Sequence, residues 1–212
     1  MGFTLDCRRC DRLAGFLDEV GAQYPEYHAR PVTSFGNEGS RFLIVGLAPG
    51  MHGANRTGRP FTGDYAGNLL YGTLYRHGFA TSPEPLDADG NANSNLRLVD
   101  CRIANAVRCL PPQNKPLPVE IKTCNGYLAD ELSMLPKAVL ALGTIAHQAV
   151  LGALKLRKAD YAFSHGARHG LPNGIELFDS YHCSRYNTQT RRLTSDMFDS
   201  VIASIASHLG KV

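Results

Sequence analysis

Four of the six cysteines in this 212-residue chain have a spacing that could hold a metal centre. Cys7 and Cys10 form a Cys-x-x-Cys pair, and Cys124 lies fifteen residues after Cys109. Two cysteines three residues apart chelate one centre well, and two distant ones can complete a set of four thiolate ligands. This spacing fits tetrahedral zinc and a four-iron, four-sulfur cluster equally. The alternative is that Cys109 and Cys124 are buried core residues and that the Cys7–Cys10 pair is incidental.

A glycine-rich segment from Gly46 to Gly67 (GLAPGMHGANRTGRPFTGDYAG) could bind a small planar ligand. Its small residues allow the backbone to approach a ligand closely. Phe61 offers a stacking face and Asp64 is the only carboxylate. Hydrogen-bond donors come from His52, Asn55, Arg56 and Arg59. The alternative is a surface loop with a buried Phe61, in which Asp64 caps the helix that follows.

A basic segment, Tyr181 to Thr194 (YHCSRYNTQTRRLT), follows the last predicted strand. The strand delivers His182, and basic, polar and aromatic side chains then alternate in a pattern that suits phosphate contacts and insertion into a groove. The candidate DNA contacts are Arg185, Tyr186, Asn187, Arg191 and Arg192. The alternatives are a core position for His182 and a solvated helix start capped by Thr190 or Thr194.

The elements that position these segments follow from periodicity. Apolar runs predict strands over 41–47, 98–108, 138–143 and 175–181. Amphipathic spacing predicts helices over 7–27, 68–77, 119–135, 144–154 and 194–209, with Pro118 and Thr144 at two of the helix starts. Turn-forming residues predict loops over 51–67, 81–95 and 161–173.

Strands that alternate with helices predict a parallel sheet covered on both faces. We expect a three-layer α/β/α sandwich with a central, mainly four-stranded parallel sheet, formed as a single domain over residues 1–212. Ligands of such sheets bind at the carboxyl ends of the strands, where the glycine-rich and basic segments begin. Cys101 and Cys183 fall within or at the end of predicted strands, so we expect both in the core.

Composition excludes several classes of protein. With 43% hydrophobic and 19% charged residues, the chain is not disordered. The longest apolar stretch, 138–154, is interrupted by His147 and is too short for a membrane span. Charged residues occupy the place of a signal-peptide core, so we expect an intracellular, cytoplasmic protein with reduced cysteines. A net charge of +3 permits nucleic-acid binding without requiring it.

Taken together, these segments resemble the uracil-DNA glycosylase superfamily, and in particular its iron–sulfur branches, families 4 and 5. The resemblance rests on GLAPG, GRPFTGDYAG, IANAVRCLPPQNKP and HCSRYNTQTRRLT in this order, and on the four cysteines. Family 5 is the nearer, because Leu47 stands where family 4 has Glu. Gly50 replaces a usual Ala and Cys183 a usual Pro or Val, and these departures bear on which bases are accepted.

The resemblance implies a monofunctional DNA glycosylase. It would hydrolyse the N-glycosidic bond of uracil and other deaminated bases in DNA and leave an abasic site. The implied catalytic residues are Asp64, which would position or deprotonate water, His182, which would donate to the departing base, and Asn105, which would read its edge. The implied substrate-binding residues are Gly46, Ala48, Gly50, Phe61, Asn105 and His182.

The resemblance also implies a 4Fe-4S cluster on Cys7, Cys10, Cys109 and Cys124, a monomeric state, and no membrane partner. Related glycosylases carry a Tyr in the strand-one loop that excludes bulky bases. Gly50 and Met51 stand in that region here, which would leave the pocket wall open to larger bases. Two other classes stay open. One is a non-catalytic iron–sulfur nucleic-acid-binding protein. The other is a zinc-stabilised nucleotide-binding protein, although no GxGxxG or Walker-type loop follows the first strand.

Overall fold

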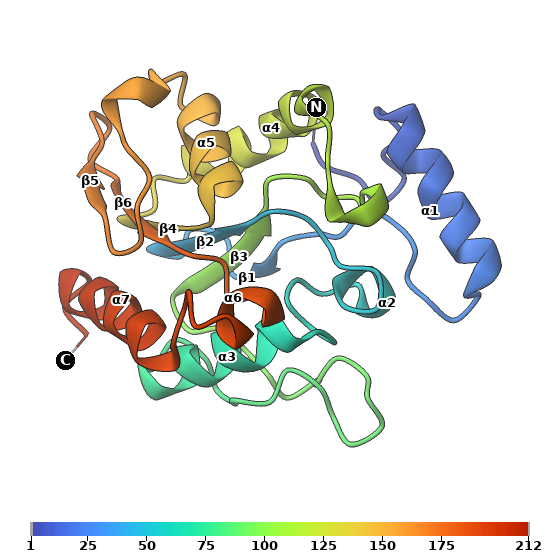
Figure 1. Ribbon diagram of the computed structural model, residues 1–212, viewed down its shortest axis with the longest axis horizontal. Helices are drawn as coiled ribbons and strands as arrows, with labels where there is room; N and C mark the ends of the chain where they lie inside the picture. The colour runs from blue at the N-terminus through green and yellow to red at the C-terminus, as the bar shows by residue number, and fades with distance from the viewer. Residues whose placement is uncertain (1, 212) are drawn as a thin grey trace.

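The sheet of the molecule is built from four parallel strands with a short antiparallel strand at each edge. The computed structural model describes residues 2–211 (Figure 1). The strand order is β1-β3-β2-β4-β6-β5. The strands are β1 (Phe35–Gly36), β2 (Phe42–Gly46), β3 (Cys101–Asn105), β4 (Ala138–Leu142), β5 (Arg168–Gly170) and β6 (Glu176–Ser180). The predicted four-stranded parallel core is therefore confirmed.

Helices cover both faces of the sheet (Figure 1). They are α1 (Asp11–Gln23), α2 (Ala54–Thr57), α3 (Tyr65–Arg76), α4 (Pro118–Ser133), α5 (Thr144–Ala153), α6 (Arg185–Gln189) and α7 (Ser195–His208), with 3₁₀ turns η1 (Pro112–Asn114) and η2 (Lys158–Asp160). Within residues 2–211, none of these helices has the length and apolarity to cross a bilayer.

Alternate side chains of β2 pack into two apolar clusters, one on each face of the sheet. Phe42 and Ile44 face α3 and α7, whereas Leu43 and Val45 face α4 and α5. Every residue of β2 is buried, which explains why its sequence is continuously apolar rather than alternating. The expected three-layer sandwich is thus the observed one.

Several predicted boundaries are wrong for identifiable reasons. The predicted loop 161–173 contains β5, a three-residue edge strand too short to show a period. α1 begins at Asp11, so the first two cysteines precede it, and α3 begins at Tyr65. The basic segment forms the short helix α6. Thr144 does not cap α5, because Gly143, with φ 94°, occupies the cap position.

Helix α1 lies outside the two helical layers (Figure 1). Its buried residues Leu13 and Leu17 belong to a third apolar cluster that also contains Val107, Cys109 and Cys124. An ion pair adds to this attachment, since Arg12 donates to both carboxylate oxygens of Glu120 at 2.7 Å. The helix is therefore fixed to the body mainly around the cysteines.

A buried ionic network fixes the end of β3 against α4. Glu131 accepts hydrogen bonds from Arg102 at 2.5 Å and from Arg108 at 3.1 Å, and the hydroxyl of Ser34 also donates to it. Burial alone would raise the pKa of Glu131, but the bonds from Arg102 and Ser34 outweigh it and lower that pKa. Arg108 directly precedes Cys109, so the network holds the cysteine-bearing loop in place.

We expect Glu131→Gln to lower the free energy of unfolding by about 3 kcal/mol, because it leaves buried guanidinium groups without their counter-charge. Urea unfolding at pH 7 measures this. The matched control is Asp160→Asn, which breaks the exposed pair with Arg157 and should change stability by less than about 0.5 kcal/mol. Since the pKa of Glu131 is lowered on folding, the difference should shrink as the pH falls below the ordinary range for Glu. Equal effects of the two variants would contradict this role.

Candidate functional site

A cavity of about 560 Å³ opens at the carboxyl ends of the central strands. Residues from four segments line it: the chain after β2 up to the start of α3, the end of β3, the proline-rich loop at η1 and the chain after β6. Seven of the predicted site residues are among them, namely Ala48, Gly50, Phe61, Asp64, Asn105, His182 and Arg185. The cavity lies at the edge of the sheet where the sequence predicts the site.

Beside the cavity, Gly46 makes a close contact with two of the lining residues, Asn105 and Phe61. Gly46 and Asn105 are register partners in the parallel pair β2 and β3. A Cβ atom on Gly46 would lie 2.5 Å from Asn105 Oδ1 and 2.6 Å from the ring of Phe61. Gly46, predicted as a substrate contact, is thus not a cavity residue. It lies behind the other two and makes room for them.

Asn105 presents an unused amide to this site. Its side chain is 4% exposed, and its Oδ1 atom has no hydrogen-bond partner among the described residues. Buried polar atoms are nearly always hydrogen-bonded, so a free acceptor here indicates a ligand group or water as its partner. An amide can accept one hydrogen bond and donate another along a single planar edge.

Phe61 is held in a strained position beside His182. Its φ is 55°, in the left-handed region that non-glycine residues rarely adopt. Its ring stacks on that of His182, with the centroids 5.7 Å apart and the planes at 27°. A Cβ on Gly67 would come within 1.9 Å of the Phe61 carbonyl oxygen, so only glycine lets α3 start here. Backbone strain of this kind is typical of functional sites.

His182 has an imidazole that stays neutral at physiological pH. Desolvation by burial lowers its pKa to about 4. The side-chain amide of Asn187 donates to the backbone carbonyl of His182 at 2.8 Å and fixes this segment. A neutral imidazole keeps one N–H donor, which can face a base oxygen without adding a buried charge.

Asp64 both caps α3 and faces the cavity. Its Oδ1 accepts a hydrogen bond from the Gly67 N–H at 3.2 Å, so the alternative prediction of an N-cap is confirmed. Its Oδ2 lies against two glycines: a Cβ on Gly53 would be 2.6 Å away, and one on Gly50 3.3 Å away. Desolvation raises the pKa of Asp64, while backbone hydrogen bonds partly offset that effect. A carboxylate with a raised pKa accepts protons more readily.

The structure adds cavity residues that sequence reasoning did not single out. They are Leu47, Ala54, Tyr65, Ala66, Asn114 and Ser184. Asn114 and its neighbour Gln113 both have positive φ, near 55°. Asn114 lies in the proline-rich loop PPQNKP, where two consecutive left-handed residues leave no distinct sequence signal. Met51 is not a cavity residue, because it packs against the apolar cluster around the cysteines.

The basic segment lies at the mouth of the cavity. Arg185 lines the cavity, and Tyr186 at the start of α6 is 72% exposed. Arg191 and Arg192 are also exposed, and the Arg192 guanidinium lies 4.5 Å from the centroid of the Tyr181 ring. Asn187 is half-buried and is engaged with the His182 carbonyl. Four of the five predicted DNA contacts thus present exposed side chains beside the cleft.

The four predicted metal-ligating cysteines meet in one pocket. The pocket is lined by Cys7, Cys10, Cys109 and Cys124 together with Phe3, Leu13 and Tyr127. All four cysteines are free thiols. Desolvation, followed by the proximity of the other three sulfurs, raises the pKa of Cys109 to about 12. Four thiols crowded in an apolar pocket cannot ionise together without a bound cation, so the donor set suits a metal centre.

The spread of the sulfurs bears on the size of that centre. Thiolates around one zinc ion lie about 3.8 Å apart, as a tetrahedron with bonds of about 2.3 Å requires. Among the described residues, the one set of three or more ligand groups within 4.8 Å of each other lies elsewhere in the molecule. No three of the four pocket sulfurs therefore lie within 4.8 Å of one another. The Tyr127 hydroxyl lies 3.4 Å from Cys7 Sγ, and the Arg108 backbone N–H donates to Cys124 Sγ at 3.3 Å.

The remaining two cysteines behave as predicted. Cys101 in β3 and Cys183 after β6 are both 0% exposed and belong to the main apolar core. Burial keeps the pKa of each thiol well above its usual range. Neither lines the cysteine pocket, so the structure separates four cysteines that share a pocket from two that lie in the core.

Comparison with known proteins agrees with this geometry. The sequence profile of the uracil DNA glycosylase superfamily matches residues 33–206. A type-5 uracil-DNA glycosylase of Thermus thermophilus is 46% identical over 92% of this chain and 90% of its own length. One from Mycobacterium leprae is 42% identical over 92% and 88%. A type-4 uracil-DNA glycosylase of Archaeoglobus fulgidus is 30% identical over 72% and 62%.

The resemblance inferred from the motifs is confirmed, including the order of the two branches, since the type-5 proteins match more closely and over more of the chain than the type-4 protein. With a family profile that covers most of the chain and a cleft built from the expected residues, this chain belongs to the uracil-DNA glycosylase superfamily.

Proposed function

We propose that this protein is a DNA repair glycosylase that binds a flipped uracil in the 560 Å³ cavity and hydrolyses its N-glycosidic bond. The observation that carries the proposal is the buried, unpartnered Oδ1 of Asn105. Uracil offers one ring N–H between two carbonyl oxygens. A single amide can accept a hydrogen bond from the ring N–H through its oxygen and donate one to a carbonyl oxygen through its NH₂ group. The ring of Phe61 supplies the adjoining apolar face.

Two side chains divide the chemistry. As the bond to the sugar breaks, negative charge grows on the base, and the neutral imidazole of His182 donates a hydrogen bond to the oxygen that receives it. The sugar becomes cation-like and is attacked by water. The Asp64 carboxylate, anchored through Oδ1 by the Gly67 N–H, uses Oδ2 to orient the water or accept its proton. A uracil anion leaves readily, so no second carboxylate is required.

The base range extends to other deaminated bases, including the purine hypoxanthine. Gly50 is a cavity residue, and a Cβ at this position would press on Asp64 Oδ2 at 3.3 Å. The absence of a side chain at position 50 therefore both widens the cavity wall and leaves the carboxylate free. An exposed rim formed by Arg185, Tyr186, Arg191 and Arg192 binds the duplex around the lesion, with Tyr186 at its tip.

The cysteine pocket holds a 4Fe-4S cluster on Cys7, Cys10, Cys109 and Cys124. The apolar lining, the spread of the thiols and the hydrogen-bonding groups beside Cys7 and Cys124 support this assignment. When bound, the cluster supplies four strong links between the chain before α1, the end of β3 and α4. The cluster is structural in this proposal, because the cavity residues lie in a separate pocket.

Asp64→Asn separates an enzyme from a protein that only binds DNA. It keeps the shape and loses the charge, so the affinity for a uracil-containing duplex should be nearly intact. The single-turnover rate of base release should fall on the order of 100-fold. The control Asp89→Asn alters an exposed loop carboxylate and should cleave at the wild-type rate. If Asp64→Asn cleaves as fast as the wild type, the proposed role of Asp64 is wrong.

The pH dependence of the same rate tests which group titrates. His182 remains neutral down to a pH of about 4, so it should contribute no change between pH 5.5 and 8. The raised pKa of Asp64 means that its carboxylate is lost earlier on acidification, which predicts a fall in rate on the acid side. That fall should be absent in Asp64→Asn. An acid limb that instead disappears in His182→Gln would reverse the assignment.

Replacing any one of the four pocket cysteines by Ala should bleach the brown protein and destabilise it, because each thiolate is a ligand of the cluster. Iron content and visible absorbance measure the loss. Cys101→Ala is the matched control, a buried cysteine outside the pocket that should keep full colour. A colourless wild-type protein that carries one zinc ion in place of iron would favour the zinc alternative.

Arg191→Gln and Arg192→Gln should weaken binding to duplexes of every sequence and reduce the salt dependence of affinity, because phosphate contacts carry no sequence information. Fluorescence anisotropy at several salt concentrations measures both. Arg157→Gln, at an exposed position paired with Asp160, is the control and should leave the affinity and its salt slope unchanged. Wild-type behaviour in both loop variants would remove this segment from the interface.

A further inference from the structure

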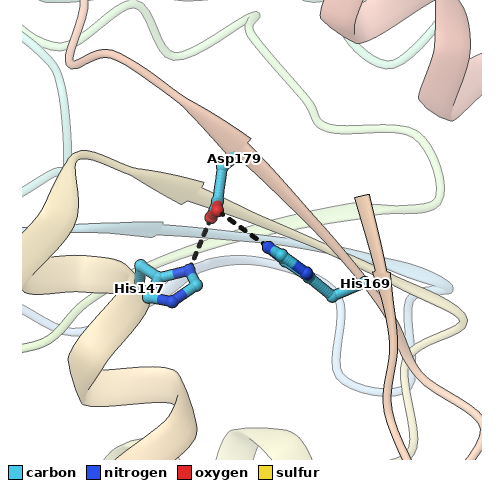
Figure 2. Close-up of side chains that lie close together, drawn as sticks. All are labelled: His147, His169 and Asp179. Atoms are coloured by element: carbon cyan, nitrogen blue, oxygen red, sulfur yellow. Dashed lines mark hydrogen bonds and ion pairs between the residues drawn. The ribbon is translucent and has the colours of Figure 1, made fainter. Parts of the chain in front are cut away.

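A second group of ligating side chains lies apart from both pockets. His147 comes from α5, His169 from β5 and Asp179 from β6, and their side chains converge (Figure 2). One ligand atom from each residue lies within 4.8 Å of the other two. Asp179 is two positions after Leu177, which belongs to the core beneath α4 and α5, so it points to that face of the sheet.

The carboxylate of Asp179 is in an environment that requires a cation. It is 0% exposed. Among residues 2–211, no Lys or Arg side chain forms an ion pair with it, and its two contacts are imidazole nitrogens. His147 Nδ1 lies 2.8 Å from Oδ1, and His169 Nε2 lies 3.3 Å from Oδ2. A buried carboxylate without a counter-charge is strongly unfavourable, so the charge must be removed by a proton on the carboxyl group itself or balanced by a proton on an imidazole or by a metal ion.

The hydrogen bonds show what each arrangement would use. His147 Nε2 lies 3.0 Å from the Tyr161 carbonyl, which can only accept, so Nε2 carries a proton. Nδ1 is the nitrogen that faces Asp179, either as a second N–H donor or as a lone pair for a metal ion. Metal-binding histidines are commonly oriented in this way, by a carbonyl on the far nitrogen. A second proton on His147 would satisfy the contact with Oδ1. It would leave Asp179 Oδ2 and His169 Nε2 buried without hydrogen-bond partners, as they are in the structure.

We propose that His147, His169 and Asp179 bind one divalent transition-metal ion, with zinc as the occupant. Two imidazoles and a carboxylate are a donor set that zinc takes readily, with water as a fourth ligand. A metal ion would use the lone pairs of all three side chains. These include Asp179 Oδ2 and His169 Nε2, the two atoms that a proton on His147 leaves without a hydrogen-bond partner. The His169 side chain is 17% exposed, which gives the ion a path from solvent. The ion would fasten the edge strand β5 and the chain at Tyr161 to α5 and β6.

Zinc uptake by the intact protein tests this site. Protein with its iron centre in place is treated with a chelator, its iron content is checked, and zinc is titrated against a chromophoric competitor. We expect one zinc ion per chain and a rise in the melting temperature on zinc addition. His169→Ala and Asp179→Asn should each weaken zinc binding at least about 100-fold and abolish that rise. His208→Ala is the matched control, since His208 lies beside the same strand and contacts Arg168.

X-ray absorption at the zinc edge identifies the ligands. Nitrogen and oxygen neighbours at about 2.0 Å, without sulfur at about 2.3 Å, are expected for this site, whereas zinc in the cysteine pocket would show sulfur. Because His169 is partly exposed, His169→Ala keeps the test valid even if Asp179→Asn does not fold. A sulfur shell, unchanged zinc affinity in His169→Ala, or no uptake at micromolar zinc would each overturn the proposal. None of these results depends on glycosylase activity.

Discussion

The contact between Gly46, Asn105 and Phe61 is the constraint on which the cleft depends. The parallel register of β2 and β3 sets Gly46 beside Asn105, and the missing Cβ lets the Phe61 ring close over both. Phe61 in turn sets the start of α3 and the position of His182. A side chain at position 46 would therefore displace Asn105, Phe61 and His182 together. The positions of these side chains are therefore set by the register of the sheet rather than by the loops alone.

The cleft and the cysteine pocket are mechanically connected through the end of β3. Ala106 N–H donates to the Gly46 carbonyl and Val107 N–H to that of Leu47, both at 2.9 Å. Cys109 follows two residues later, and Arg108 between them is locked by Glu131. The loop that carries the cysteine is therefore continuous with the strand end that carries Asn105. A change at one pocket alters the backbone that shapes the other.

The sequence predicted the four central strands, about half of the residues that line the cavity and the separation of four cysteines from two, because each rests on a long apolar run or on a motif of fixed spacing. It did not predict β5, since three residues of an edge strand carry no period and pair only because β6 offers a free edge. It also missed the grouping of His147, His169 and Asp179, which come from three elements and share no motif. Contacts that arise only from packing leave no local signal in one sequence.

The peripheral position of α1 has a consequence for how the molecule matures. A helix of 13 residues is too short to persist alone in water, and this one is attached mainly around the cysteines. Cys10 and Cys109 are 99 positions apart, so closing that loop must await synthesis of the third strand. With the cluster proposed for this pocket, α1 would join the body only when iron and sulfide are delivered. Cellular iron supply would then govern the lifetime of the protein, because unloaded chains would present α1 and the segment before it to proteases.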